Sequence, residues 1–361
     1  MKNLPRLLLG IFFAVCQILS GLTIASAQSA VPNTGQTPQR QQSADASPAL
    51  SLTLLNEARN LINAGKARTA IEKLSALPNQ NDVRVLHLLG MAYYELGDQE
   101  RTIGLLTQVW DNLPAKSPEK REAIKTLGEA HYLAGHHADA LPYLEQVLEW
   151  DVDNVELNYL IGVSNLNIKQ PAKARECFSR IFKFAPESAS AHLLTAQMMI
   201  RSRFFAEAET ELRQAIQKDP KLPVASHLLA QLVARRMQPD EAITLLEKEL
   251  AINPGNGMAY FNLGEAYCQL SKWEQALLPI RKAIWLEPYF SSSYILLGKI
   301  YFQKKDLSSS VTVLKQAIQL DPNSKSAHYY LGKTYEQLGR AIEAKQEFLT
   351  SENLPGIVQW Q

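Results

Sequence analysis

Apolar residues recur at helical spacing through most of the chain, in paired segments separated by short polar turns. One segment runs from Met258 to Leu270 and the next from Glu274 to Leu286, with Ser271 and Lys272 between them. In the first segment the apolar positions share one helical face: Tyr260, Phe261, Leu263, Ala266, Tyr267 and Leu270. Pro288 ends the second segment, because proline lacks an amide hydrogen and disfavours helical backbone before it. The pattern predicts a hairpin of two helices.

This hairpin pattern repeats at one constant interval along the chain. Proline returns at Pro186, Pro220, Pro254, Pro288 and Pro322. One small residue keeps the same step at Gly128, Gly162, Ala196, Ala230, Gly264, Gly298 and Gly332, and another at Ala140, Ala174, Ala208, Ala242, Ala276, Ser310 and Ala344. Three registers with one period identify a repeat array, in which each unit contacts only its neighbours. The registers predict that Gly264 and Ala276 face each other, so that the two helices approach closely.

Nine hairpins fit this period between residues 49 and 353, and residues 354–361 form a C-terminal tail. The hairpins begin near Ser51, Val83, Arg121, Val155, Ala189, Pro223, Gly257, Ser291 and Lys325. Gly65 and Gly97 end the first helices of the first two hairpins, where a left-handed glycine commonly caps the helix.

The step from Gly90 to Gly128 is longer than the steps elsewhere in this register. The extra residues lie near Pro114 to Pro118. They predict either a hinge between Leu113 and Glu122 or a longer loop on a rigid stack.

The registers resemble the tetratricopeptide repeat, whose consensus is Trp-x2-Leu-Gly-x2-Tyr followed by Ala, Phe, Ala and Pro over about 34 residues. The unit from Ser291 matches at Tyr294, Leu297, Gly298, Tyr301, Ser310, Leu314, Ala317 and Pro322. The unit from Lys325 matches at His328, Leu331, Gly332, Tyr335, Ala344 and Phe348. The resemblance implies an all-α fold, an α-solenoid of about nine TPR helix-turn-helix hairpins in a right-handed superhelix. Together with the N-terminal segment described below, it indicates an exported bacterial member of the family.

The resemblance also implies that the first helices line a concave, partly aromatic groove that binds a partner. The expected groove residues are Tyr159, Val163, Leu166, Leu193, Gln197, Ile200, Arg201, His227, Gln231, Arg235, Met258, Phe261, Gln269, Ile295, Lys299, Phe302, Gln303, Tyr329, Lys333 and Gln337. Apolar anchors and amides of this kind suit an extended or helical peptide. The alternative is that most of these residues pack helix against helix or face solvent.

Residues 1–27 are typical of an export signal. Lys2 and Arg6 precede a mostly apolar run from Leu7 to Ile24, and Ala25-Ser26-Ala27 offers a cleavage site. The alternative is an uncleaved membrane anchor. Residues 28–48 are rich in Gln, Ser, Ala, Pro and Thr and predict a disordered linker. We therefore expect an exported protein, periplasmic or secreted, or in the alternative one anchored by its N-terminus.

Charge and motifs narrow the function further. The 37 basic and 36 acidic residues are balanced, which does not suit a general nucleic-acid binder. The sequence has no His-Glu-x-x-His motif, no glycine-rich phosphate loop and no Gly-x-Ser-x-Gly elbow. His131, His136 and His137 form its densest histidine group, but they match no metal-binding motif. We expect no enzyme activity, no cofactor and no metal.

Cysteine spacing adds a prediction about thiols. Cys177 and Cys268 are separated by more than two repeats. Packed helices are about 8–10 Å apart, whereas a disulfide needs Cα atoms within about 7 Å. The two thiols are therefore expected to be unpaired.

These observations predict a non-enzymatic scaffold of the bacterial cell envelope that captures a protein or peptide in its groove. The alternative is a carbohydrate-binding accessory protein of a polysaccharide synthesis or export system, with Tyr159, Phe261, Phe302 and Tyr329 stacking on sugar rings. No nucleic-acid partner is expected, and membrane contact only through an uncleaved N-terminal segment.

Overall fold

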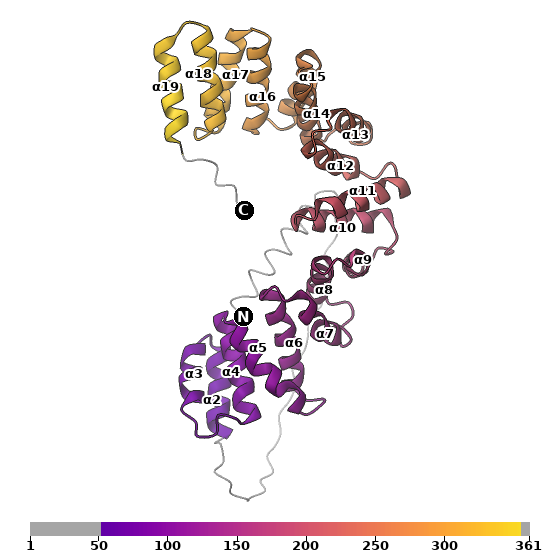
Figure 1. Ribbon diagram of the computed structural model, residues 1–361, viewed down its shortest axis with the longest axis vertical. Helices are drawn as coiled ribbons and strands as arrows, with labels where there is room; N and C mark the ends of the chain where they lie inside the picture. The colour runs from indigo at the N-terminus through magenta and orange to yellow at the C-terminus, as the bar shows by residue number, and fades with distance from the viewer. Residues whose placement is uncertain (1–51, 355–361) are drawn as a thin grey trace, which may run out of the picture. The chain divides into compact units, whose positions relative to one another are not determined.

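The computed structural model describes residues 52–354, and all regular elements in this range are helices (Figure 1). The expected export signal at residues 1–27, the linker at residues 28–48 and the tail beyond Leu354 lie outside it. None of the described helices combines the length and apolar character that crossing a membrane requires. The prediction of an all-α fold is confirmed for this part of the chain.

The helices form two compact units, which divide between Pro186 and Glu187. The first unit contains α2 (Leu52–Asn63), α3 (Ala67–Ser75), α4 (Val83–Leu96), α5 (Gln99–Val109), the 3-10 turn η1 (Trp110–Asn112), α6 (Pro118–Leu133), α7 (His137–Leu148), α8 (Val155–Asn167) and α9 (Pro171–Phe182). The second contains α10 (Ala189–Arg201), α11 (Phe205–Lys218), α12 (Ala225–Arg235), α13 (Pro239–Ile252), α14 (Gly257–Gln269), α15 (Trp273–Leu286), α16 (Ser291–Gln303), α17 (Leu307–Leu320), α18 (Lys325–Gln337) and α19 (Ala341–Asn353).

Within each unit the helices pack in chain order as two-helix hairpins. Each even-numbered helix is the first of its hairpin and packs on the odd-numbered second helix that follows. That second helix in turn packs on the first helix of the next hairpin of the unit. Each unit is thus a solenoid, in which a hairpin buries its apolar face against its neighbours.

The turn inside each of the nine described hairpins passes through one residue with left-handed backbone. These residues are Gly65, Gly97, Gly135, Lys169, Arg203, Met237, Ser271, Lys305 and Gly339. The following amide donates to a carbonyl near the end of the first helix, as Lys272 N–H does to Tyr267 at 2.9 Å, which is a Schellman cap. The predicted caps at Gly65 and Gly97 are confirmed. Left-handed backbone costs a residue other than glycine about 1–2 kcal/mol, so packing of the two helices must impose this turn.

The additional residues between Gly90 and Gly128 belong to a longer helix α6 and to a packed connection before it. α6 begins at Pro118, before the predicted start at Arg121, and has 16 residues against 13 in α8. Ser117 caps it by accepting a hydrogen bond from the Lys120 amide at 3.1 Å. Leu113, inside the connection, is buried in a core cluster. This packing favours the longer connection over the hinge.

Both cysteines are buried and free, which confirms the prediction of unpaired thiols. Cys177 belongs to α9 and Cys268 to α14. Burial raises the pKa of each thiol to about 11. The thiolate form that reacts with oxidants is therefore disfavoured at both positions.

A glycine in the first helix lets a large side chain of the second helix reach its backbone. A Cβ added at Gly264 would lie 2.3 Å from Ile280 Cδ1, whereas the nearest atom of Ala276 is its carbonyl oxygen at 3.5 Å. The predicted approach of Gly264 and Ala276 is therefore present, and Ser310 on α17 likewise donates to the Gly298 carbonyl at 2.9 Å. The tightest contact of Gly264 is nevertheless with the Ile280 side chain, one turn after Ala276. The same contact joins Gly90 to Leu106, Gly128 to Leu144, Gly162 to Phe178, Gly298 to Leu314 and Gly332 to Phe348.

We predict that Gly162→Ala destabilises the first unit by about 1–3 kcal/mol, because the new methyl group would lie 2.4 Å from the buried Phe178 ring. Gly104 in α5 is the matched control, since a Cβ there meets nothing within 4 Å. Gly104→Ala should stabilise by about 0.5–1 kcal/mol through helix propensity. Urea unfolding followed by circular dichroism measures both effects. Equal stability of the two variants would contradict the close contact.

Candidate partner-binding surface

The first helices of each unit lie on the inner side of its row of hairpins. In the second unit α12 contacts α14, α14 contacts α16 and α16 contacts α18, and in the first unit α2, α4, α6 and α8 do the same in turn. No two second helices of the described chain contact each other to a comparable extent. Elements that approach one another more closely lie on the inner curve of a bent row. The surface of the first helices is therefore the candidate binding surface of each unit.

The expected groove residues differ widely in exposure. Arg201, Gln231, Arg235, Gln269, Gln303, Tyr329 and Gln337 are exposed. Tyr159, Val163, Leu193, Gln197, Ile200, Met258, Phe261, Ile295, Lys299 and Lys333 are half-buried. Of these, Tyr159 and Val163 belong to the first unit, and the others lie on first helices of the second. The second unit thus carries most of the candidate surface.

Three expected groove residues are buried, and the prediction that they contact a partner is wrong. Leu166 is 3% exposed, His227 7% and Phe302 8%. A first helix in these rows has its own second helix on one side and further helices on the others, so only a narrow strip of it reaches solvent. These three side chains are part of the interior.

His227 links two neighbouring first helices. The Asn262 amide nitrogen of α14 lies 2.8 Å from His227 Nε2 on α12. Gln231, one turn further along α12, lies 3.3 Å from the same ring nitrogen. Burial lowers the pKa of His227 to about 4, so the imidazole is neutral near neutral pH. The residue holds the candidate surface together and does not line it.

A cluster of aromatic and basic groups, with one exposed ring, lies on α16 and α18. The Lys333 ammonium is 5.4 Å from the centre of the Tyr329 ring, and Lys299 is 5.9 Å from that of Tyr330. Tyr329 packs edge-on against Tyr330 at 5.6 Å and remains 43% exposed. We call Lys299, Tyr329, Tyr330 and Lys333 the lysine–tyrosine cluster. It combines an accessible ring with two positive charges.

Other predicted side chains are held by neighbours. The Phe261 ring packs edge-on against Phe290 at 5.2 Å, just before α16. The Arg235 guanidinium lies 4.3 Å from the centre of the Phe205 ring at the start of α11. Each contact joins consecutive hairpins of the second unit, which limits the freedom of these side chains to reorganise around a partner.

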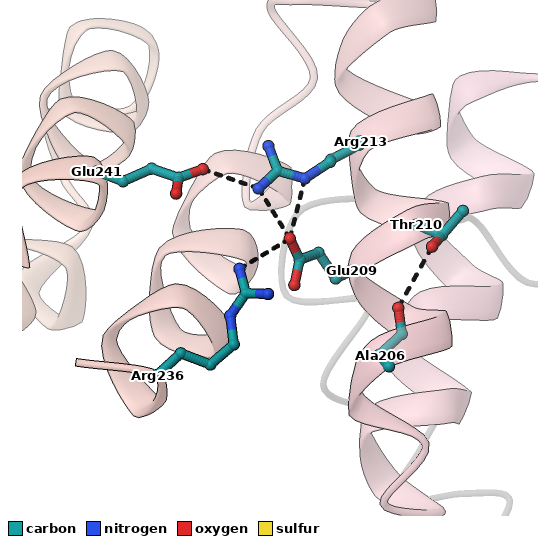
Figure 2. Close-up of polar contacts among 6 residues, drawn as sticks. All are labelled: Ala206, Glu209, Thr210, Arg213, Arg236 and Glu241. Atoms are coloured by element: carbon teal, nitrogen blue, oxygen red, sulfur yellow. Dashed lines mark hydrogen bonds and ion pairs between the residues drawn. The ribbon is translucent and has the colours of Figure 1, made fainter. Parts of the chain in front are cut away.

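An ion network also joins consecutive hairpins of this unit (Figure 2). Glu209 on α11 accepts hydrogen bonds from Arg213 at 2.8 Å and from Arg236, just after α12, at 3.0 Å. Arg213 also donates to Glu241 on α13 at 2.8 Å. Sequence reasoning missed this network, because only the Glu209–Arg213 pair has the helical spacing that a sequence reveals. It joins the first two hairpins of the second unit.

Comparisons with protein families identify the chain. Models of the tetratricopeptide repeat match residues 84–115, 131–198 and 245–277, and a TPR repeat model matches residues 298–339. The chain belongs to the tetratricopeptide repeat family, as its registers predict.

The search of curated proteins found no match to the chain. Among solved structures, MamA from Desulfovibrio magneticus RS-1 is 21% identical, with 46% of this chain and 94% of that chain covered and a TM-score of 0.44. YrrB, titled a TPR protein with an unusual peptide-binding site, is 15% identical, with coverages of 51% and 95% and a TM-score of 0.40. The APC/C Cut9–Hcn1 hetero-tetramer is 16% identical, with coverages of 79% and 56% and a TM-score of 0.42.

We predict that His227 makes the second unit sensitive to acid. Its folded-state pKa is depressed to about 4 from 6.5, so the native state resists protonation. Neutral His227 therefore contributes fully to the free energy of unfolding above pH 6.5. This contribution decreases by on the order of 2–3 kcal/mol as the pH falls towards 4, because the unfolded chain binds a proton there and the folded one does not. His227→Gln keeps an amide for Asn262 but cannot titrate. The difference in unfolding free energy between parent and variant should change across this window, and a difference independent of pH would contradict the assignment.

Proposed function

We propose that the chain is a non-enzymatic scaffold that holds a protein or peptide partner against the first helices of its second unit. The observation that carries the proposal is the lysine–tyrosine cluster, where Tyr329 is exposed between neighbouring side chains that hold its ring in place. A ring that is already ordered loses little conformational entropy on binding, which makes it a suitable anchor.

The chemistry of the cluster favours a partner segment with an acidic group next to an apolar one. Lys299 and Lys333 occupy the same register of consecutive first helices, one repeat apart, and each ammonium sits beside a tyrosine ring. A carboxylate can pair with an ammonium while the neighbouring apolar group covers Tyr329.

Exposed glutamines supply a second kind of contact. Gln269, Gln303 and Gln337 are the last residues of α14, α16 and α18. Side-chain amides can both donate to and accept from the backbone of an extended peptide. Gln337 Oε1 already accepts from Lys305 at 3.3 Å, which orients its amide nitrogen as a remaining donor.

Carbohydrate binding has less support in the structure. Stacking on sugar rings needs exposed aromatic faces, and four residues were expected to provide them. Phe302 is buried and Tyr159 and Phe261 are half-buried, so Tyr329 alone of the four is exposed. Protein or peptide binding therefore remains the function that this surface favours.

The test variant replaces the proposed anchor Tyr329 and its neighbour Lys333, neither of which is fully buried. Tyr329→Ala with Lys333→Glu should reduce recovery of a partner from cell-envelope extracts by about tenfold or more, because both contacts are lost and a charge is reversed. Quantitative mass spectrometry of material captured on the immobilised protein measures the change.

The matched control carries the same two changes at other exposed positions. Tyr289 precedes α16 and Lys315 lies on the second helix α17, and both are exposed. Tyr289→Ala with Lys315→Glu should leave capture unchanged, and both double variants should keep the helical circular dichroism of the parent. Equal loss in both, or no loss in the first, would contradict the proposed surface.

The proposed place of action is the cell envelope, which residues 1–27 support through their basic start, apolar run and Ala-x-Ala site. N-terminal sequencing of the protein isolated from its native cells should find a chain that begins at Gln28. Recovery of the uncleaved N-terminus in the membrane fraction would support the anchored alternative instead.

A further inference from the structure

The turn between α6 and α7 brings together three side chains that metals commonly bind. His131 lies in the last turn of α6, His136 directly precedes α7, and Asp139 lies in the first turn of α7. The backbone holds these positions, since His136 N–H donates to the His131 carbonyl at 2.8 Å and Asp139 N–H to that of His136 at 3.1 Å. Gly135, with φ of 80°, allows the tight reversal.

One ligand atom from each of the three side chains lies within 4.8 Å of the other two. The two imidazole rings are 5.9 Å apart between centres and inclined at 53°. In a tetrahedral site with ligands about 2.0–2.1 Å from the ion, ligand atoms lie about 3.3 Å from one another. The ligand atoms must therefore approach one another more closely than they do now. The side chains of His136 and Asp139 are exposed and can rotate towards His131, which stays in place.

His131 carries the independent evidence for a ligand. Its side chain is only 9% exposed, yet its Nδ1 has no hydrogen-bond partner in the described part of the protein. A buried nitrogen left unpaired is costly, and a bound ion would satisfy it. The Tyr143 ring stacks on the imidazole at 5.7 Å with 5° between the planes and so fixes its orientation.

His137, the third member of the histidine group, is directed elsewhere. Its Nδ1 lies 3.5 Å from Ser164 Oγ on α8, and its ring packs edge-on against Tyr132 at 5.4 Å. The cluster of possible metal ligands therefore includes Asp139 and not His137.

We propose that His131, His136 and Asp139 form a binding site for a divalent transition-metal ion of the zinc class. Two imidazole nitrogens and one carboxylate oxygen suit Zn²⁺, whereas Ca²⁺ and Mg²⁺ need more oxygen ligands. Three protein ligands leave a fourth position for water or for a side chain of a bound protein. We expected no metal site because the sequence contains no known metal-binding motif. A site whose ligands are brought together by a glycine turn does not need such a motif.

Isothermal titration of the tag-free, EDTA-stripped full chain with Zn²⁺ tests the proposal. The parent should bind one ion per chain at this turn, and His136→Gln and Asp139→Asn should each weaken binding by about tenfold or more. Both replaced residues are exposed, so the fold should survive. His137→Gln is the matched control and should bind as the parent does.

Co²⁺ provides a second readout, because its visible absorption reports nitrogen ligands and a low coordination number. The parent and His137→Gln should give the same Co²⁺ spectrum, and His136→Gln with Asp139→Asn should lose it. No Zn²⁺ binding by the parent would overturn the proposal. So would binding that the double variant retains at the affinity of the parent.

Discussion

The close approach of two helices within each hairpin is the constraint on which the rest of the structure depends. A glycine in the first helix receives a large side chain from the second, as Gly162 receives Phe178 and Gly298 receives Leu314. The left-handed turn that joins the helices follows from this approach, because residues such as Met237 and Ser271 adopt it despite its cost. Local backbone strain is thus offset by burial of side chains between the two helices.

The hairpin geometry determines what each helix can do. A second helix packs on the first helix of its own hairpin and, where a hairpin follows in the unit, on that first helix as well, while first helices of the second unit also contact one another. The part of α14, α16 and α18 that solvent reaches is a narrow strip, which holds exposed Tyr329 and the exposed terminal glutamines beside the half-buried cluster lysines. Folding and the proposed binding therefore use different residues of the same helix: Leu331 is buried and Tyr329 is exposed.

Periodicity predicted the hairpins, their small-residue registers and the family, because equivalent positions of every repeat carry the same type of residue. It did not predict which side chain fills the space beside Gly264, since register alone cannot distinguish Ala276 from Ile280. Nor did it separate buried His227 and Phe302 from exposed Tyr329, because exposure depends on the contacts of each helix with the next hairpin. The His131–His136–Asp139 group was missed for a related reason: a turn, and not one helical face, brings it together.

The central claim is that a partner binds to the first helices of the second unit. An experimental structure of the protein in complex with a captured partner tests it most directly. The account predicts that the partner contacts Tyr329 and Lys333 and continues along α16 and α14. A partner seated on the second helices α15 and α17, with the lysine–tyrosine cluster left open to solvent, would contradict it.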